Sequence, residues 1–309
     1  MTINADSARQ RGGTDTRGLL YAIGACGTWG MFPVFFPLLQ PATAPEVLAH
    51  RMVWTVVFMA VVLIAVGRVS DLRLINGRTW LLLACASILI SINWFIFVYA
   101  VNNGHVVDAA LGYFINPLVS VLFGVVIFGE RLNRAQSAAV LIALAAIIVL
   151  SVEVDATPLI GIGLALSFGL YGVVKKVVTT DPRVSVAVEA GIAAPLAVAF
   201  LVVLQVNGHG QFTNHGPGHA ALVVLSGPLT AIPLLMFAAA AQRLPLVTLG
   251  LLTYLNPALQ MTWGILVRHE PMPPARWIGF GLIWVALVVF SADAVAHAYR
   301  GRAGKLLLS

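Results

Sequence analysis

The sequence predicts an all-α membrane protein with ten transmembrane helices, built from two inverted five-helix repeats. The first observation is composition: 60% of the 309 residues are hydrophobic and 10% are charged, whereas a soluble domain carries about 25% charged residues. The second is hydropathy, because the mean hydropathy is +0.93 and apolar runs long enough to cross a ~30 Å hydrocarbon core recur along the chain. The third is an internal match between the two halves of the chain.

The apolar runs divide the chain into ten predicted spans joined by short connections. Windows of about 19 residues place these spans at 18–39, 46–67, 80–101, 106–129, 134–152, 158–176, 184–206, 219–241, 245–267 and 276–298. The predicted organisation is a polar tail at 1–17, a first repeat at 18–152, a second repeat at 158–298 and a basic tail at 299–309. The polar tail lacks a small-residue cleavage site, so we expect the first span to be retained.

The basic residues predict the orientation of the chain. Lys and Arg are concentrated in the two tails and in the second, fourth, sixth and eighth loops, whereas the opposite side has only Arg268 and Arg276. Because cytoplasmic segments carry the excess of Lys and Arg, we expect a multi-pass protein of the cell inner membrane with both termini in the cytoplasm. Arg51 belongs to neither side, since it lies within a span.

The internal match predicts the relation between the halves. Four residues of the predicted fourth span and its end recur 140 positions later in the ninth. They are Asn116, Pro117, Gly124 and Glu130, matched by Asn256, Pro257, Gly264 and Glu270. Since each half has five spans, an odd number, the second half enters the membrane from the opposite face. Inverted repeats are typical of secondary transporters that work by alternating access.

Several segments also resemble a known family. They are AHRMVW (49–54), NWFIFVYAVNNGHVVDAALGYFINP (93–117), FGERL (128–132), GLALSFGLYGVVKK (163–176) and LGLLTYLNP (249–257). These segments resemble the RarD group of the EamA family, in the drug/metabolite transporter superfamily, and the resemblance extends from about residue 17 to residue 298. It implies ten helices, two EamA repeats, an inner-membrane location and export of small organic solutes such as metabolites or drugs. The sequence departs from its own first half at Arg268-His269-Glu270, which aligns with Phe128-Gly129-Glu130.

Aromatic and amide side chains within the spans are the candidate solute-binding residues. They are Trp29, Asn93, Trp94, Tyr113, Asn116, Tyr171, Tyr254 and Asn256. The rings could line a cavity for a flat or hydrophobic solute, or they could form interfacial aromatic belts. At 1.5 Å per residue, Asn116 and Asn256 both come near the centre of the bilayer. The following Pro117 and Pro257 are therefore hinge candidates; the alternative is that both Asn-Pro pairs serve only helix packing.

Two charged residues within spans are candidates for ion or proton coupling. Arg51 and Glu189 occupy matching places in the second and seventh spans, and ionisable groups inside a membrane are costly unless they have a function or a partner. Arg51 could instead extend to the membrane surface, and Glu189 could be solvated. Inverted repeats place them toward opposite faces, so we do not expect them to pair. Lys175 and Lys176 are expected to anchor the sixth span at the cytoplasmic side.

Other functions find little support in the sequence. The basic residues are scattered between apolar runs, which argues against a nucleic-acid partner. Neither a phosphate-binding loop nor a nucleophile-base set is present in the spans, so we expect neither an enzyme nor a cofactor. We expect no metal site at His209, His215 and His219, and we expect Cys26 and Cys85 to pack as small hydrophobic residues. The expected partners are a small-molecule substrate, the lipid bilayer and a coupling proton or ion. A homodimer, an intramembrane enzyme and a non-transporting membrane scaffold remain open alternatives.

Overall fold

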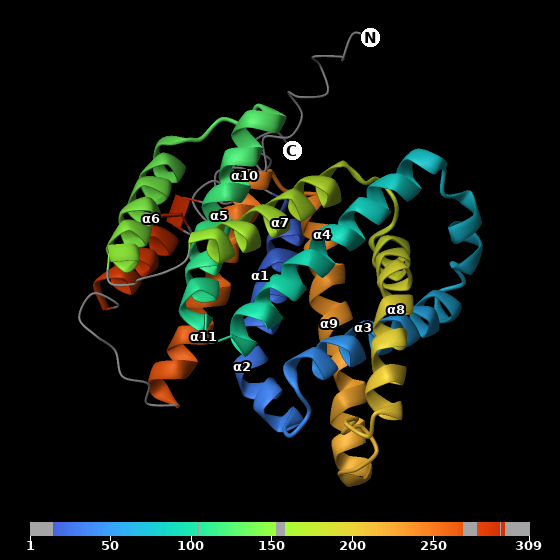
Figure 1. The fold of residues 1–309 in the computed structure, drawn as a ribbon. Helices are drawn as coiled ribbons and strands as arrows, with labels where there is room; N and C mark the ends of the chain where they lie inside the picture. Colours follow the sequence, from blue (N-terminus) through green and yellow to red (C-terminus); the bar gives the residue numbers. More distant parts are fainter. Residues whose placement is uncertain (1–14, 104, 153–157, 268–276, 291, 294–309) are drawn as a thin grey trace.

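The computed structural model describes residues 15–103, 105–152, 158–267, 277–290 and 292–293, and all the regular structure in these residues is helical. The first half contains α1 (Thr16–Gly30), α2 (Phe32–Phe35), η2 (Phe36–Leu39), α3 (Ala44–Ala65), η3 (Val69–Leu74), α4 (Gly77–Asn102), α5 (Val106–Phe128) and α6 (Arg134–Val152). The second half contains α7 (Pro158–Val177), α8 (Pro182–Val206), α9 (Gly216–Ala241), α10 (Leu246–Thr253), α11 (Leu255–Leu266) and a further helix at Trp277–Phe290. Figure 1 shows these helices packed side by side.

The prediction of a multi-pass helical membrane protein is confirmed, whereas the exact number of ten spans is not. Within the described residues, seven helical segments are long and apolar enough to cross a membrane, counting Thr16–Leu39 as one. The predicted fifth and tenth spans coincide with shorter apolar helices, and the ninth is divided into α10 and α11. The predicted tenth span also continues past the described residues.

Short-range signals explain where several helices begin and end. The Asp15 side chain accepts hydrogen bonds from the amides of Arg17 and Gly18 at the start of α1. Asn76 caps the amide of Thr79 in α4 in the same way, and such caps stabilise a helix by about 1 kcal/mol. Gly129 ends α5 with a φ of 63°, a left-handed conformation that suits glycine.

The two matched prolines act differently on their helices. A proline has no amide hydrogen, so the carbonyl four residues before it loses its helical donor. In the second half the helix is interrupted at Tyr254, between α10 and α11, three residues before Pro257. In the first half α5 continues through Pro117 without interruption. The matched Asn-Pro sequences therefore produce a broken helix in only one of the two halves.

Helix contacts between the two halves occur in exchanged pairs. Here α1, α3, α4 and α5 correspond in order to α7, α8, α9 and the α10–α11 segment. The contact of α1 with α9 corresponds to that of α7 with α4. The contact of α3 with α9 corresponds to that of α8 with α4. The contact of α5 with α7 corresponds to that of α1 with α10 and α11. The remaining large contacts, α3 with α8 and α5 with α10, map onto themselves. This is the pattern that an internal twofold relation between the halves produces.

Two glycines permit close contact between the halves. A Cβ atom at Gly227 in α9 would lie 2.6 Å from the carbonyl oxygen of Trp54 in α3, and one at Gly250 in α10 would lie 3.0 Å from the carbonyl oxygen of Pro117 in α5. Both neighbours are backbone atoms, which cannot rotate away as a side chain can. At these two crossings, the halves therefore approach each other backbone to backbone.

Candidate functional site

A cavity of about 170 Å³ lies between the two halves and is lined by helices of both. Its lining residues are Trp29, Phe32, Pro33, Phe36, Arg51, Ile90, Asn93, Trp94, Phe97, Tyr113, Asn116, Phe168, Leu234, Thr253, Asn256, Pro257 and Gln260. Aromatic rings supply much of this wall, amides supply most of its polar groups, and one side chain is cationic. A concave, largely apolar site with a few polar groups is the usual form of a small-molecule site.

The structure brings six of the eight predicted solute-binding residues together in this cavity. They are Trp29, Asn93, Trp94, Tyr113, Asn116 and Asn256, and the hinge candidate Pro257 joins them. Tyr171 and Tyr254 lie outside the lining and are 0% and 1% exposed. The Tyr171 ring stacks on Phe237, and Tyr254 occupies the break between α10 and α11. The hinge candidate Pro117 also lies outside the lining, at the crossing of α5 with α10.

Arg51 is held inside an aromatic cage. Its guanidinium carbon lies 5.2 Å from the ring centroid of Phe32, 5.1 Å from that of Phe36 and 5.1 Å from that of Trp94. Its Nε donates a 2.9 Å hydrogen bond to Oγ1 of Thr230 in α9. The residue is 8% exposed, so its side chain is buried in the protein and does not extend to the surface. Cation–π contacts offset part of the cost of placing this charge in an apolar region.

The amide side chains that line the cavity differ in how many of their polar groups form hydrogen bonds. Nδ2 of Asn93 donates to the carbonyl of Leu164 and to Ser167, which ties α4 to α7. Asn256 accepts a 2.8 Å hydrogen bond from Gln260. In contrast, the buried Oδ1 of Asn116 has no hydrogen-bond partner among the described residues. Because an unsatisfied buried acceptor is costly, Asn116 has a hydrogen-bonding capacity that the described residues leave unused.

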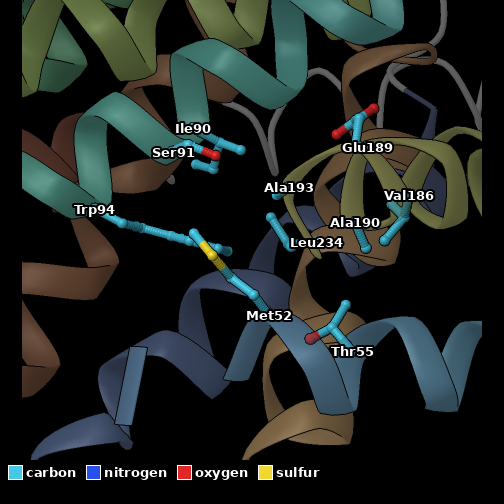
Figure 2. Close-up of a pocket in the computed structure, with 10 residues that line it drawn as sticks. All are labelled: Met52, Thr55, Ile90, Ser91, Trp94, Val186, Glu189, Ala190, Ala193 and Leu234. Atoms are coloured by element: carbon cyan, nitrogen blue, oxygen red, sulfur yellow. The ribbon is translucent and has the colours of Figure 1, made fainter. Parts of the chain in front are cut away.

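A second, smaller pocket adjoins the cavity and is shown in Figure 2. Its volume of about 20 Å³ is enough for roughly one water molecule. Ile90, Trp94 and Leu234 line both this pocket and the cavity. Trp94 lies on one side of the small pocket and Glu189 on the other (Figure 2). The cavity and the Glu189 pocket therefore share three lining side chains.

Glu189 is the centre of a buried polar cluster between α7 and α8. Its Oε1 accepts hydrogen bonds from Nζ of Lys175 at 2.6 Å and from Oγ of Ser185 at 2.8 Å. The hydroxyl of Tyr171 donates to Oε2 at 3.2 Å. The side chains of Lys175 and Glu189 are 1% and 5% exposed, so Glu189 is not a solvated carboxylate. Arg51 and Glu189 bond to different residues, consistent with the expectation that they do not pair.

The expected role of Lys175 as a surface anchor is wrong. The sequence places it at the end of a span, where lysine usually reaches water, but its side chain is 1% exposed and bonds to Ser185 and Glu189 of α8. Ser185 and Glu189 are four residues apart and therefore share one face of α8, and this face meets Lys175. The sequence signal that could have identified the pair was two opposite charges at the ends of consecutive apolar runs.

A third cluster joins the halves at the start of α10. The two carboxylate oxygens of Glu130 each accept a 2.8 Å hydrogen bond, one from the amide of Leu246 and one from the amide of Val247. Nζ of Lys176 lies 3.2 Å from the Glu130 carboxylate and donates to the carbonyl of Leu244 at 2.7 Å. A carboxylate at a helix N-terminus satisfies free amides and the positive end of the helix dipole. Its sequence match Glu270, with Arg268 and His269, lies outside the described residues.

Other residues considered in the sequence have local roles. Cys26 and Cys85 are free, and Cys26 is buried. A ring nitrogen of His219 lies 3.1 Å from the carbonyl oxygen of Leu39, and one of His215 lies 2.7 Å from the side-chain oxygen of Gln211.

The sequence matches one family over almost its whole length. The model of the EamA-like transporter family matches twice, at residues 16–152 and 157–292. The chain belongs to the EamA-like transporter family. It is similar to Protein RarD of Streptomyces exfoliatus, with 46% identity over 93% of this chain and 91% of the relative. It is also similar to the uncharacterized transporter YojE of Bacillus subtilis, with 39% identity over 90% and 95%, and to Protein RarD of Escherichia coli, with 34% identity over the same shares.

The fold of this EamA-like transporter also has a solved counterpart. A chain of known crystal structure superposes with a TM-score of 0.70 and 18% identity, covering 90% of this chain and 98% of the other. At that identity the likeness concerns the fold alone. Together, the family match and the apolar helices make the protein a membrane transporter of the drug/metabolite kind, which points away from an enzyme.

Proposed function

We propose that this EamA-like transporter is a secondary transporter that exports small organic solutes across the cell inner membrane by alternating access. The observation that carries the proposal is the cavity between the two halves, with aromatic walls and an amide acceptor that no described residue satisfies. The exchanged helix contacts support it, because two related halves that pack across one cavity can rock about it. Both termini are proposed to be cytoplasmic.

The contacts around the cavity indicate which side is closed in this conformation. Under the proposed topology, Phe36 and Arg51 lie toward the outer surface, and both line the cavity. The Glu130 cluster lies at the cytoplasmic ends of α5, α7 and α10, where it joins the two halves. We therefore assign this conformation to an outward-facing state. Opening toward the cytoplasm then requires separation of Glu130 from the start of α10.

Glu189 is the proposed coupling residue. It is an intramembrane carboxylate, and its pocket shares the lining residues Ile90, Trp94 and Leu234 with the cavity. Protonation of Glu189 would remove the negative charge that holds Lys175, and a change in this contact between α7 and α8 would act directly on the wall of the cavity. The pocket beside Glu189 has room for about one water molecule, which is enough to pass a proton.

Transport can be tested with the full chain in proteoliposomes and in cells. Extracellular solute pools are compared for cells with the protein, without it, and with Asn116→Leu. The solutes whose export rises are then assayed in proteoliposomes. We expect export with the wild type and loss of export with Asn116→Leu, since the nearly isosteric leucine removes the amide. Asn103→Leu is the matched control, because Asn103 is exposed and lies outside the cavity. A protein that changes no pool and moves no solute in proteoliposomes would be a membrane scaffold.

A further inference from the structure

We propose that the cavity binds organic anions, with Arg51 as the group that recognises a carboxylate and the aromatic walls as the surface for a flat apolar body. This inference rests on the proposed transport function and names the substrate class of the same site.

The first support is the hydrogen-bonding capacity of Arg51. A guanidinium has five N–H donors arranged as a planar fork that matches a carboxylate. One of them, on Nε, is used by Thr230. The four N–H donors of the terminal amino groups form no hydrogen bond with the residues that the structure describes. Thr230 and the three rings thus fix the orientation of the guanidinium and leave its bidentate edge available.

The second support is the absence of a compensating charge. No lining residue of the cavity, within the described part of the chain, is acidic. The nearby carboxylate of Glu46, in the same helix as Arg51, accepts from the amide of Gln211, and Glu189 is paired with Lys175. A buried cation without a counter-ion in an apolar region is costly. A bound anion would remove that cost, so the cavity favours negatively charged solutes over neutral or positive ones.

The third support is the size and surface of the cavity. Its volume of about 170 Å³ greatly exceeds the ~10–15 Å³ that one water molecule needs, so a halide ion alone would leave most of it unfilled. Rings of Trp29, Trp94 and Phe168 lie along the same cavity as Arg51. Aromatic faces bind flat apolar groups. A carboxylate attached to an aromatic ring therefore fits both the charge and the walls.

The test measures binding separately from transport. The full chain is reconstituted in nanodiscs of phosphatidylcholine and titrated by calorimetry with benzoate, phenylacetate and naphthoate, and with the neutral amide of each. We expect each carboxylate to bind the wild type more tightly than its amide. Arg51→Gln should weaken carboxylate binding by about 10- to 100-fold, as expected for loss of a charge-assisted hydrogen-bonded pair, and should change amide binding by less than about threefold.

Control variants distinguish recognition from folding. Arg183→Gln removes an arginine that is paired with Asp181 outside the cavity, and it should leave carboxylate binding unchanged. Arg51→Lys keeps the charge without the planar fork and should give an intermediate affinity. Thr230→Val should weaken carboxylate binding less than Arg51→Gln does, because it removes only the group that orients Nε. Retained amide binding by Arg51→Gln shows that this variant is folded.

Several outcomes would overturn the inference. They are equal binding of amides and carboxylates, no carboxylate binding at all, and carboxylate binding that Arg51→Gln leaves intact. Saturation by chloride or phosphate alone would identify an inorganic anion site. If phosphatidylglycerol added to the nanodiscs weakens carboxylate binding to the wild type but not to Arg51→Gln, the occupant would be a lipid headgroup. Carboxylate binding that depends on Arg51, without transport in proteoliposomes, would support the inference and reject the proposed function.

Discussion

At the scale of single residues, Lys175 and Glu189 form an ion pair that α7 and α8 remove from water. Burial of two charges is costly, and their attraction offsets that cost only when both are present and well hydrogen-bonded. Here Ser185 and Tyr171 provide the additional hydrogen bonds. A change in the charge of either partner therefore alters the free energy of packing α7 against α8.

The first prediction concerns the energy source for transport. Glu189→Gln should abolish transport driven by a proton gradient, because glutamine cannot bind and release a proton, while solute exchange without a gradient should persist. Both activities are measured in proteoliposomes with an imposed pH difference, and Asp71→Asn, at a half-buried carboxylate paired with Arg68, is the control. Gradient-driven uptake equal to that of the wild type would exclude Glu189 as the coupling residue.

The second prediction concerns the pair itself. Lys175→Met leaves the Glu189 carboxylate buried without a counter-charge, which should destabilise the protein by about 3–5 kcal/mol. The double variant Lys175→Met/Glu189→Gln contains no isolated charge and should recover most of that loss. The measurement is the midpoint of thermal unfolding in detergent. If the single and double variants unfold at the same temperature, the two side chains are not energetically coupled.

The sequence predicted the site residues unevenly, and the difference has a physical reason. Depth along a span follows from counting residues, so Asn116 and Asn256 could be placed near the cavity from the sequence. The direction in which a side chain points around its helix depends on which helices pack against it. Tyr171 and Lys175 were therefore misjudged or missed, because their partners, Phe237 of α9 and Glu189 of α8, are brought to them only by the fold.

At the scale of helices, close crossings between the halves depend on residues without a side chain. Gly227 makes the closest of these contacts with backbone, because the backbone of Trp54 occupies the space that a Cβ atom would need. Overpacking of this kind typically costs about 1–3 kcal/mol.

The third prediction follows from this crossing. Gly227→Ala should lower the unfolding temperature, because α9 must move away from α3 to accommodate the methyl group. Gly191→Ala in α8 is the matched control. No neighbouring atom lies within 4 Å of a Cβ at that position, so it should be neutral or stabilising by up to about 1 kcal/mol through helix propensity. Similar behaviour of the two variants in thermal unfolding would argue against a tight α3–α9 contact.

The fourth prediction concerns the Glu130 cluster as an inner gate. Glu130→Ala removes the cap of α10 and the partner of Lys176, so the protein should populate the state open to the cytoplasm more often. A single cysteine replaces Asn256 in a background lacking Cys26 and Cys85, and an impermeant thiol reagent is applied to inside-out vesicles. Labelling from the cytoplasmic side should rise in Glu130→Ala.

Arg131→Ala is the control for that experiment, since the exposed Arg131 adjoins Glu130. In Arg131→Ala, the cysteine at position 256 should label as slowly as in the single-cysteine protein that retains both Glu130 and Arg131. Equal labelling rates for all three proteins would show that Glu130 does not hold the cytoplasmic side closed.

At the scale of the whole molecule, the positions of the helices were largely predictable, and their division into spans was not. Long apolar runs determined α3, α4, α5, α8 and α9 to within a few residues of their ends. The break at Tyr254 was less accessible. It depends on how the segment packs, whereas hydropathy reports only transfer from water to lipid.

The fifth prediction tests the orientation of the whole chain. Reporter fusions after Arg78, Arg183 and Arg243 should be active in the cytoplasm, because basic loops remain on that side. Fusions after Gln40 and Gly210 should report the opposite side. A cytoplasmic signal at both Gln40 and Gly210 would contradict the inverted arrangement.

The Arg51 cage and the Glu189 cluster have a common origin in the repeat. Arg51 and Glu189 occupy corresponding positions in α3 and α8, and at the 139-residue offset of the first span Phe36 corresponds to Lys175. The corresponding positions thus hold a cation facing aromatic rings in one half and an anion facing a lysine in the other. Two identical inverted halves would present the same energy profile from either face. On the proposed route, a cation that no described carboxylate pairs in one half and a neutral ion pair in the other would be electrically asymmetric, so a charged solute would meet a different barrier from each side.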